Sequence, residues 1–149
     1  MENLEKFKEK FCTHVCRAKR LDNGEWVYGN LILSGDADEG WEAIIVPVIN
    51  SRIFHNPDFG DLGFGTWFQV DPETICHCVG KVCNEYIWEN DIVCGSDYKN
   101  GQKYKHVGQV NYVGRAYVVV GINQYEGRHE ELTGLYNVIG NIFDNPELL

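Results

Sequence analysis

The sequence predicts a mainly β protein, a small barrel- or sandwich-like domain with a short N-terminal helix. Three observations lead to this prediction: short β-branched and aromatic segments recur at close intervals, glycine-containing turn signals separate them, and helical periodicity is scarce. The 149 residues, 44% of them hydrophobic, suffice for one compact domain with a core. We therefore expect a helical extension over residues 1–12 and a single β-rich domain over residues 13–149.

The N-terminal extension is the one segment with helical periodicity. Leu4, Phe7 and Phe11 recur at helical spacing among Lys and Glu, which predicts a short amphipathic helix. A single small domain has little core space for an added helix. We therefore expect a second subunit to cover the apolar face and the protein to be a homo-oligomer.

The first strands follow this extension. Residues 13–20 read as a strand, and Asp22-Asn23-Gly24 is a turn signal because Asn and Gly tolerate a positive φ. A hairpin through Trp26, Tyr28 and Leu31 should follow. The β-branched run over residues 43–49 contains Pro47, which cannot donate to a ladder, so it predicts either an edge strand or a buried strand with a break.

The segment over residues 56–65 is rich in glycine and also apolar. It contains Pro57, Phe59, Gly60, Leu62, Gly63, Phe64 and Gly65. This composition predicts a loop that packs on the sheet, with a binding loop as the alternative. The glycines lack the lysine followed by serine or threonine that ends a phosphate-binding P-loop.

The remaining strands are expected from the same kind of pattern. They cover residues 66–70, 74–79, 90–94, 105–113, 116–122 and 135–143. After the last of them, Asp144-Asn145-Pro146 should stop the strand, and the short apolar tail behind it should belong to the fold.

Charge restricts the partners that this protein can bind. The formal net charge is −9, and residues 1–20 carry six Lys/Arg against three Glu, so the remainder carries seven against nineteen acids. Such an acidic body argues against duplex DNA as a partner, because duplex binding neutralises many phosphates. We find no apolar stretch of membrane-spanning length and no secretory signal, so we expect a cytoplasmic protein without a membrane partner.

The six cysteines are expected to be reduced in this compartment. Cys76, His77, Cys78, Cys83 and Cys94 lie close in sequence, and thiolate and imidazole suit zinc. A strand would put Cys76 and Cys78 on one face and His77 on the other, and the tight Cys-x-x-Cys spacing is absent. We therefore expect buried thiols and no metal or cofactor, with a zinc site as the alternative.

Several segments together resemble one family. They are Arg17-Ala18-Lys19-Arg20-Leu21-Asp22-Asn23-Gly24-Glu25-Trp26-Val27-Tyr28-Gly29, Val70-Asp71-Pro72-Glu73-Thr74-Ile75-Cys76 and the last dozen residues, Val138 to Leu149. These segments resemble the YopX-like family encoded by phages and prophages, over most of residues 15–149. The chain departs from the family pattern over residues 79–93, where a charged Asn-Gly turn is lost. The resemblance implies a phage setting inside a bacterial host cell, while the family's activity is poorly defined.

No catalytic constellation is recognisable, so we expect a binding protein and not an enzyme. Cys76 and His77 are neighbours on a strand and cannot serve each other as nucleophile and base. The main basic cluster of the body lies near Lys103 and Lys105, with Arg115 predicted nearby across a hairpin. We expect these three cations to receive a phosphate while Trp88 or Tyr112 stacks on a base.

Two functional classes follow. The first is a non-enzymatic binding protein that sequesters a host nucleotide signal or a host protein, which in a phage setting would be counter-defence. The alternative is an accessory factor for phage replication or gene expression that acts through protein or single-stranded nucleic-acid contacts.

Overall fold

The structure is a computed structural model that describes residues 14–36, 38, 41–48, 51–82 and 85–149. The helix predicted over residues 1–12 lies outside the described residues. Within them the chain is mainly β, as predicted, and its helical turns are three short 3₁₀ segments, Pro72–Thr74, Asn123–Tyr125 and Pro146–Leu148. Among the described residues no helix is long and apolar enough to cross a bilayer.

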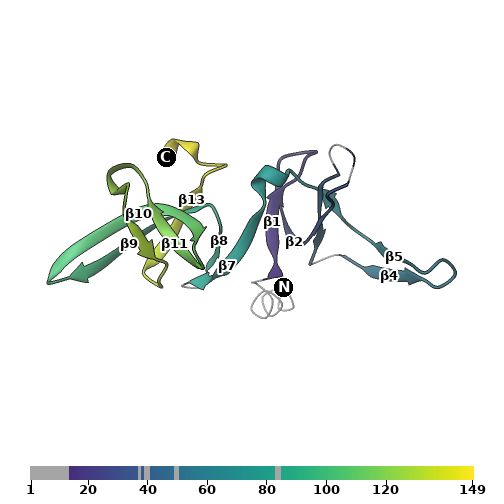
Figure 1. Cartoon of the computed structure of the whole chain (residues 1–149), viewed down its shortest axis with the longest axis horizontal. Helices are drawn as coiled ribbons and strands as arrows, with labels where there is room; N and C mark the ends of the chain where they lie inside the picture. Colours follow the sequence, from purple (N-terminus) through teal and green to yellow (C-terminus); the bar gives the residue numbers. More distant parts are fainter. Residues whose placement is uncertain (1–13, 37, 39–40, 49–50, 83–84) are drawn as a thin grey trace. The chain divides into compact units, whose positions relative to one another are not determined.

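The chain divides into two compact units, Met1–His77 and Cys78–Leu149 (Figure 1). The sequence predicted one domain over residues 13–149, and this boundary falls within it. The boundary lies in strand β7 (Cys76–Val82), whose first two residues pair with Cys16 and Arg17 of the first unit. The remainder of β7 pairs with β8 (Glu85–Trp88) in the second unit.

The first unit is an open antiparallel sheet with the strand order β6-β3-β2-β1-β7. The strands are β1 (Cys16–Lys19), β2 (Trp26–Leu33), β3 (Ala43–Pro47) and β6 (Phe68–Gln69), together with the start of β7. Gly24 has φ +71° in the turn between β1 and β2, as its turn signal predicted. Alternate residues of these strands form a core of small side chains: Cys16, Ala18, Val27, Ala43, Ile45 and Val70.

The prediction of a packed loop over residues 56–65 was wrong. The segment contributes to a separate hairpin, in which β4 (Ile53–Asn56) pairs with β5 (Asp61–Phe64). Gly60 allows the tight turn with φ +69°, and its N–H donates to the carbonyl of Asn56 at 2.9 Å. The glycine content indicated an irregular segment, but here glycine serves a turn and two narrow strand positions.

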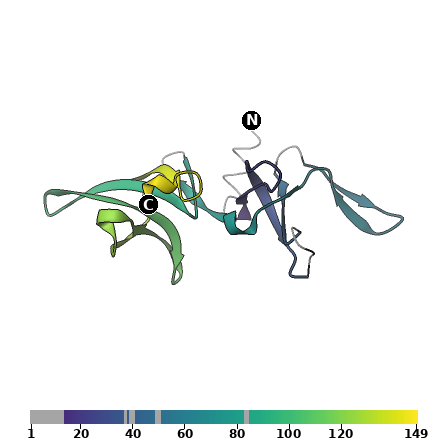
Figure 2. The same cartoon turned by 90° about the horizontal axis from the view of Figure 1, so that it is seen from above.

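The second unit, coloured from teal through green to yellow in Figure 2, contains a five-stranded antiparallel sheet. Its strand order is β12-β11-β10-β9-β13. Its strands are β9 (Asp91–Lys99), β10 (Gln102–Val113), β11 (Ala116–Gly121), β12 (His129–Glu131) and β13 (Tyr136–Asn141). Its core consists of Ile87, Val93, Val110, Val119 and Tyr136. The C-terminal tail belongs to the fold, as predicted, because Asn123 Nδ2 donates to the carbonyl of Leu148 at 2.9 Å.

Of the predicted barrel- or sandwich-like domain, the barrel alternative is wrong for the described residues, because their sheets are open. In the second sheet the end strands β12 and β13 each have one neighbour and do not pair with each other. The first sheet likewise ends on β6, which has only two residues. Closing a barrel requires its first and last strands to pair with matched length and stagger, and these end strands do not.

Candidate functional site

The structure separates the five residues that the sequence grouped as a ligand site. Lys103 and Lys105 are exposed on β10, two residues apart and therefore on one face of the strand. Arg115 lies in the turn beyond the other end of β10, at the end opposite the two lysines. The two lysines thus lie together, whereas Arg115 does not join them.

The two aromatic residues of that group are not beside the lysines either. Trp88 is only 7% exposed, at the end of β8, and its backbone N–H donates to Asp91 Oδ2 at 2.9 Å. Tyr112 is exposed but is paired across the sheet with Tyr117, their ring centroids 5.0 Å apart. Trp88 therefore offers no free face to a base in this conformation, and Tyr112 lies near the Arg115 end of β10.

A pocket of about 310 Å³ lies beside Lys105 in the second unit. It is lined by Lys105, Val107, Ile122, Asn123, Gln124, Tyr125, Ile139 and Leu148. The strand β10 supplies the first two residues, the turn after β11 the next four, β13 supplies Ile139, and the C-terminal 3₁₀ segment supplies Leu148. Side chains from four separate segments thus enclose one hollow.

Backbone hydrogen bonds hold the walls of this Lys105 pocket. The N–H of Ile122 donates to the carbonyl of Val107 at 3.1 Å, which attaches the turn after β11 to β10. Asn123 adopts φ +52°, a left-handed conformation that Asn tolerates better than most residues. The Asn123 bond to Leu148 then fixes the C-terminal wall. The pocket is therefore built by the fold and does not depend on exposed side chains alone.

The lining of the Lys105 pocket favours a small anionic ligand that also has an apolar or aromatic part. Lys105 is the cation of the lining, Tyr125 offers a half-buried ring, and Ile122 and Ile139 add apolar surface. Its volume falls at the lower end of small-molecule sites, which begin at roughly 300 Å³. Sequence reasoning missed Tyr125 because it lies in a turn 20 residues from Lys105, and only the pairing of β10 with β11 brings the two together.

A second hollow in the same unit surrounds a buried histidine. It measures about 60 Å³, and its lining includes Tyr104, His106, Glu130 and Tyr136. Tyr104 donates its hydroxyl hydrogen to Glu130 Oε1 at 2.6 Å, and the Arg128 guanidinium stacks over the Tyr104 ring at 3.9 Å. This hollow has room for a few water molecules and is far below the size of a nucleotide site.

The tautomer of His106 follows from its surroundings. Its Nε2 lies 3.1 Å from the carbonyl oxygen of Val119, and a carbonyl only accepts, so Nε2 carries the hydrogen. Nδ1 is buried and has no hydrogen-bond partner among the described residues. This ring nitrogen lies in the core near the Tyr125 ring, whose centroid is 5.8 Å from that of His106.

The first unit contains a cluster of cations and aromatic rings that sequence reasoning did not single out. Arg17 and Lys19 lie over the Trp26 ring, at 4.4 and 5.3 Å from its centroid, and Arg20 lies 4.0 Å over Phe68. The excess of Lys and Arg in residues 1–20 was the available signal. Cross-strand pairing of Lys19 with Trp26 and of Arg17 with Tyr28 places these four side chains on one sheet face.

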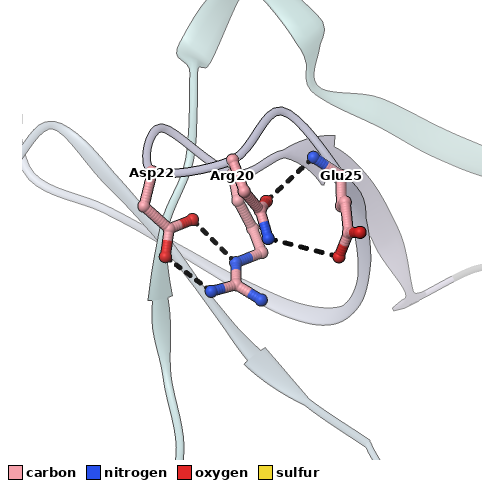
Figure 3. A network of polar contacts seen from close by, with 4 residues as sticks. Arg20, Asp22 and Glu25 are labelled. Carbon is pink, nitrogen blue, oxygen red and sulfur yellow. Dashed lines mark hydrogen bonds and ion pairs between the residues drawn. The ribbon is translucent and has the colours of Figure 1, made fainter.

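Arg20 is already engaged by an acid. Its Nε and Nη2 donate to Asp22 Oδ1 and Oδ2 at 2.9 and 2.5 Å (Figure 3). This bidentate pair raises the pKa of Arg20 and lowers the pKa of Asp22, in both cases chiefly through the side-chain hydrogen bond. The Asp22 contribution is present above its unfolded pKa and is lost as the pH falls through its lower folded value. Because Asp22 is exposed and Arg20 is only partly buried, the pair mainly fixes the β1–β2 turn.

The cysteines of the described residues are not grouped as a metal site. Cys16, Cys76 and Cys78 are buried and Cys94 is half-buried, all as free thiols. In the part of the chain that the structure describes, no three His, Cys, Asp or Glu side chains are grouped as a metal site would require. Cys83 and Cys12 fall outside that part.

Zinc analysis tests the expectation of structural thiols. Elemental analysis of purified protein should give well under one zinc per chain, and a chelator should leave the melting temperature unchanged, because a structural zinc contributes directly to folding. Stoichiometric zinc that is lost in Cys76→Ser or Cys83→Ser would contradict this expectation and establish the alternative.

A family model matches part of the chain. Residues 84–149 match the family model described as YopX protein, which confirms the resemblance over nearly all of the second unit. The Lys105 pocket and the His106 hollow lie within the matched residues. No curated protein matches the chain, and no solved structure matches it either.

Proposed function

We propose that this YopX-like chain is a non-enzymatic protein that binds a small phosphorylated ligand in the Lys105 pocket. The observation that supports this proposal is the meeting of Lys105 with Tyr125 and an apolar wall in a hollow of about 310 Å³. A phosphate would pair with the Lys105 ammonium, with Lys103 two residues away on the same strand face. A base or other flat group would pack against Tyr125 and Ile122.

The biological reading rests on the family resemblance. In a phage or prophage setting, a cytoplasmic protein that retains a nucleotide without turning it over would withdraw a host signal, which is counter-defence. The charge of the body is consistent with this ligand class, because one or two phosphates need few cations, whereas a long duplex needs many. The site assignment differs from the sequence prediction in two respects: Tyr125 takes the place of Trp88 or Tyr112, and Arg115 is not part of the site.

Thermal shift with a panel of mono-, di- and cyclic nucleotides tests this proposal. A ligand that binds only the folded state stabilises it by about 2.7 kcal/mol at a hundredfold excess over its dissociation constant, so the melting temperature should rise. Lys105→Glu should remove the shift, and Tyr125→Leu should reduce it. Arg115→Glu is the matched control, because it reverses an exposed charge at the other end of β10 and should leave the shift intact.

Three results would count against the proposal. If no nucleotide in the panel raises the melting temperature, nucleotides are excluded as ligands. If Arg115→Glu loses the shift as fully as Lys105→Glu, the ligand binds outside the Lys105 pocket. The ligand released by heat should be chemically intact. Recovery of a cleaved nucleotide would instead identify an enzyme.

One observation favours a second function, an accessory factor that binds single-stranded nucleic acid. Lys19, Trp26 and Tyr28 share one face of the first sheet, where the buried Arg17 also packs on the Trp26 ring, and aromatic rings beside an accessible cation suit stacked bases and their phosphates. Fluorescence anisotropy with a labelled oligonucleotide would decide between the two. Binding that is lost in Tyr28→Ala and retained in Lys105→Glu would favour this function over the first.

A further inference from the structure

The first unit exposes much large apolar surface. Besides Leu21 and Tyr28, eight of its exposed side chains are large and hydrophobic: Ile32, Leu33, Trp41, Ile53, Phe54, Phe59, Leu62 and Trp67. Contiguous apolar surface of this kind is uncommon on monomeric proteins and marks an interaction site. None of these residues lines the Lys105 pocket, so this surface needs an explanation of its own.

The hairpin formed by β4 and β5 carries half of these side chains. Among the described strands β4 and β5 pair only with each other, so each has one unpaired edge. Phe59 in the connecting turn is 77% exposed. A two-stranded hairpin is at best marginally stable by itself in water, and unpaired strand edges are templates for further pairing.

The register of the hairpin gives it one apolar face. Ile53 pairs with Phe64 and His55 pairs with Leu62, so these four side chains share a face, whereas Asn56 and Asp61 lie on the other. On that other face the Phe54 ring covers Gly63, where a Cβ atom would overlap it. The apolar face therefore runs along the hairpin from its turn to Phe64 at its base.

At its base the hairpin adjoins an apolar groove of about 220 Å³. Phe64 lines the groove together with Ile32, Leu33, Ser34, Trp41, Ile44 and Trp67. The rings of Trp41 and Trp67 are 5.5 Å apart and tilted by 51°. One chain thus carries both an exposed apolar projection and an apolar groove beside it.

We propose that a second copy of this chain covers the surface, with the two hairpins joined edge to edge through their β5 strands. Two-fold antiparallel pairing of β5 with its own copy puts Leu62 opposite the same residue of the partner copy, so Gly60 in the turn lies opposite the partner copy's residue 64 and each turn reaches the other copy's groove. Phe59 of each copy then packs against the tryptophan pair in the groove of the other. In this two-fold arrangement each hairpin turn fills the groove of the other copy, so both turns and both grooves are covered.

The available area fits this occupant. Aromatic side chains each bury about 150–250 Å² when covered, and four of the eight exposed residues are aromatic with 43 to 77% of their surface exposed. With the four aliphatic side chains, the surface offers on the order of 800 Å² per chain, which is what a standard interface buries on each partner. The surface is therefore large enough for a stable dimer.

Light scattering and sedimentation of the full chain test the dimer. The native chain should have twice its monomer mass of 17.1 kDa. Phe59→Asp should raise the dimer dissociation constant at least about tenfold, as for a central interface residue. Leu135→Asp is the matched control, because Leu135 is an exposed leucine of the second unit and its substitution should leave the mass unchanged. Because residue 59 is exposed in a turn, the melting temperature of monomeric Phe59→Asp checks that it is folded.

A cross-link between copies tests the arrangement. Phe59→Cys mixed with Leu33→Cys should give a disulfide-linked pair containing one chain of each variant, at a yield above that of either variant alone or of the native chain. Removal of residues 1–11 should leave this cross-link intact, whereas a dimer formed by the N-terminal segment would lose it. A native chain that is monomeric at every concentration, or that binds one copy of a different protein through Phe59, would overturn the proposal.

Discussion

Gly121→Ala is expected to destabilise the protein by more than about 3 kcal/mol. Gly121 ends β11, opposite Gly108 of β10. A Cβ atom at position 121 would overlap the backbone carbonyl of Tyr125 and lie 2.9 Å from His106 Cε1. Because the obstructing group is backbone, relief requires the turn that carries Tyr125 to move. The substitution should therefore lower both the free energy of unfolding and any ligand binding at the Lys105 pocket.

Urea unfolding followed by circular dichroism measures this effect. Gly134→Ala is the matched control in the same unit, because a Cβ atom there meets nothing within 4 Å and its φ is not in the left-handed region. That variant should lie within about 0.5 kcal/mol of the native protein. Equal stabilities of the two variants would show that the turn after β11 yields freely and that the pocket wall is not rigid.

Ile45→Ala is expected to cost about 2–5 kcal/mol. Ile45 is fully buried in β3 and is the largest side chain of a core whose other members are Val, Cys and Ala. Truncation removes the transfer free energy of the lost methylene and methyl groups and leaves a cavity, which the partly buried Leu31, Phe68 and Ile75 packed against this core can fill only in part.

Ile53→Ala supplies the comparison for the same change of side chain. Ile53 is 69% exposed in the hairpin, so its truncation should change the free energy of unfolding of the monomer by less than about 0.5 kcal/mol. Denaturant unfolding should be done with the Phe59→Asp background in both variants, so that dimerisation does not contribute. A small effect of Ile45→Ala in this background would mean that the first unit has little stability of its own.

The strands of the main sheets were largely predictable from local pattern. Residues 105–113 and 116–122 alternate and flank a glycine turn, and the structure contains β10 and β11 there, with Gly114 at φ +69°. Strand β12 was missed because His129, Glu130 and Glu131 carry no apolar alternation. Its pairing with β11 depends on backbone hydrogen bonds and on the position of its neighbour.

The hairpin and the candidate site show what local sequence pattern could not predict. Composition correctly marked residues 56–65 as unusual, but whether an apolar glycine-rich segment packs on a sheet or extends from it depends on what else the fold leaves uncovered. For the site, the charge pattern selected Lys105, which does line a pocket. Arg115 was grouped with it because a hairpin was expected to bring it near, and Trp88 because its ring could stack on a base. The 12-residue strand β10 instead carries Arg115 to its far end, and Trp88 is buried.

The sequence by itself determined the β class, most strands, the turns at Gly24 and Gly114, and the YopX resemblance that residues 84–149 confirm. These features depend on side chains within a few residues of each other, through alternation and the backbone freedom of glycine. The division into two units, the open sheets, the buried state of Trp88 and the meeting of Lys105 with Tyr125 were decided by the tertiary structure. They depend on which strands pair and in which register, and pairing joins residues whose separation in sequence leaves no local pattern.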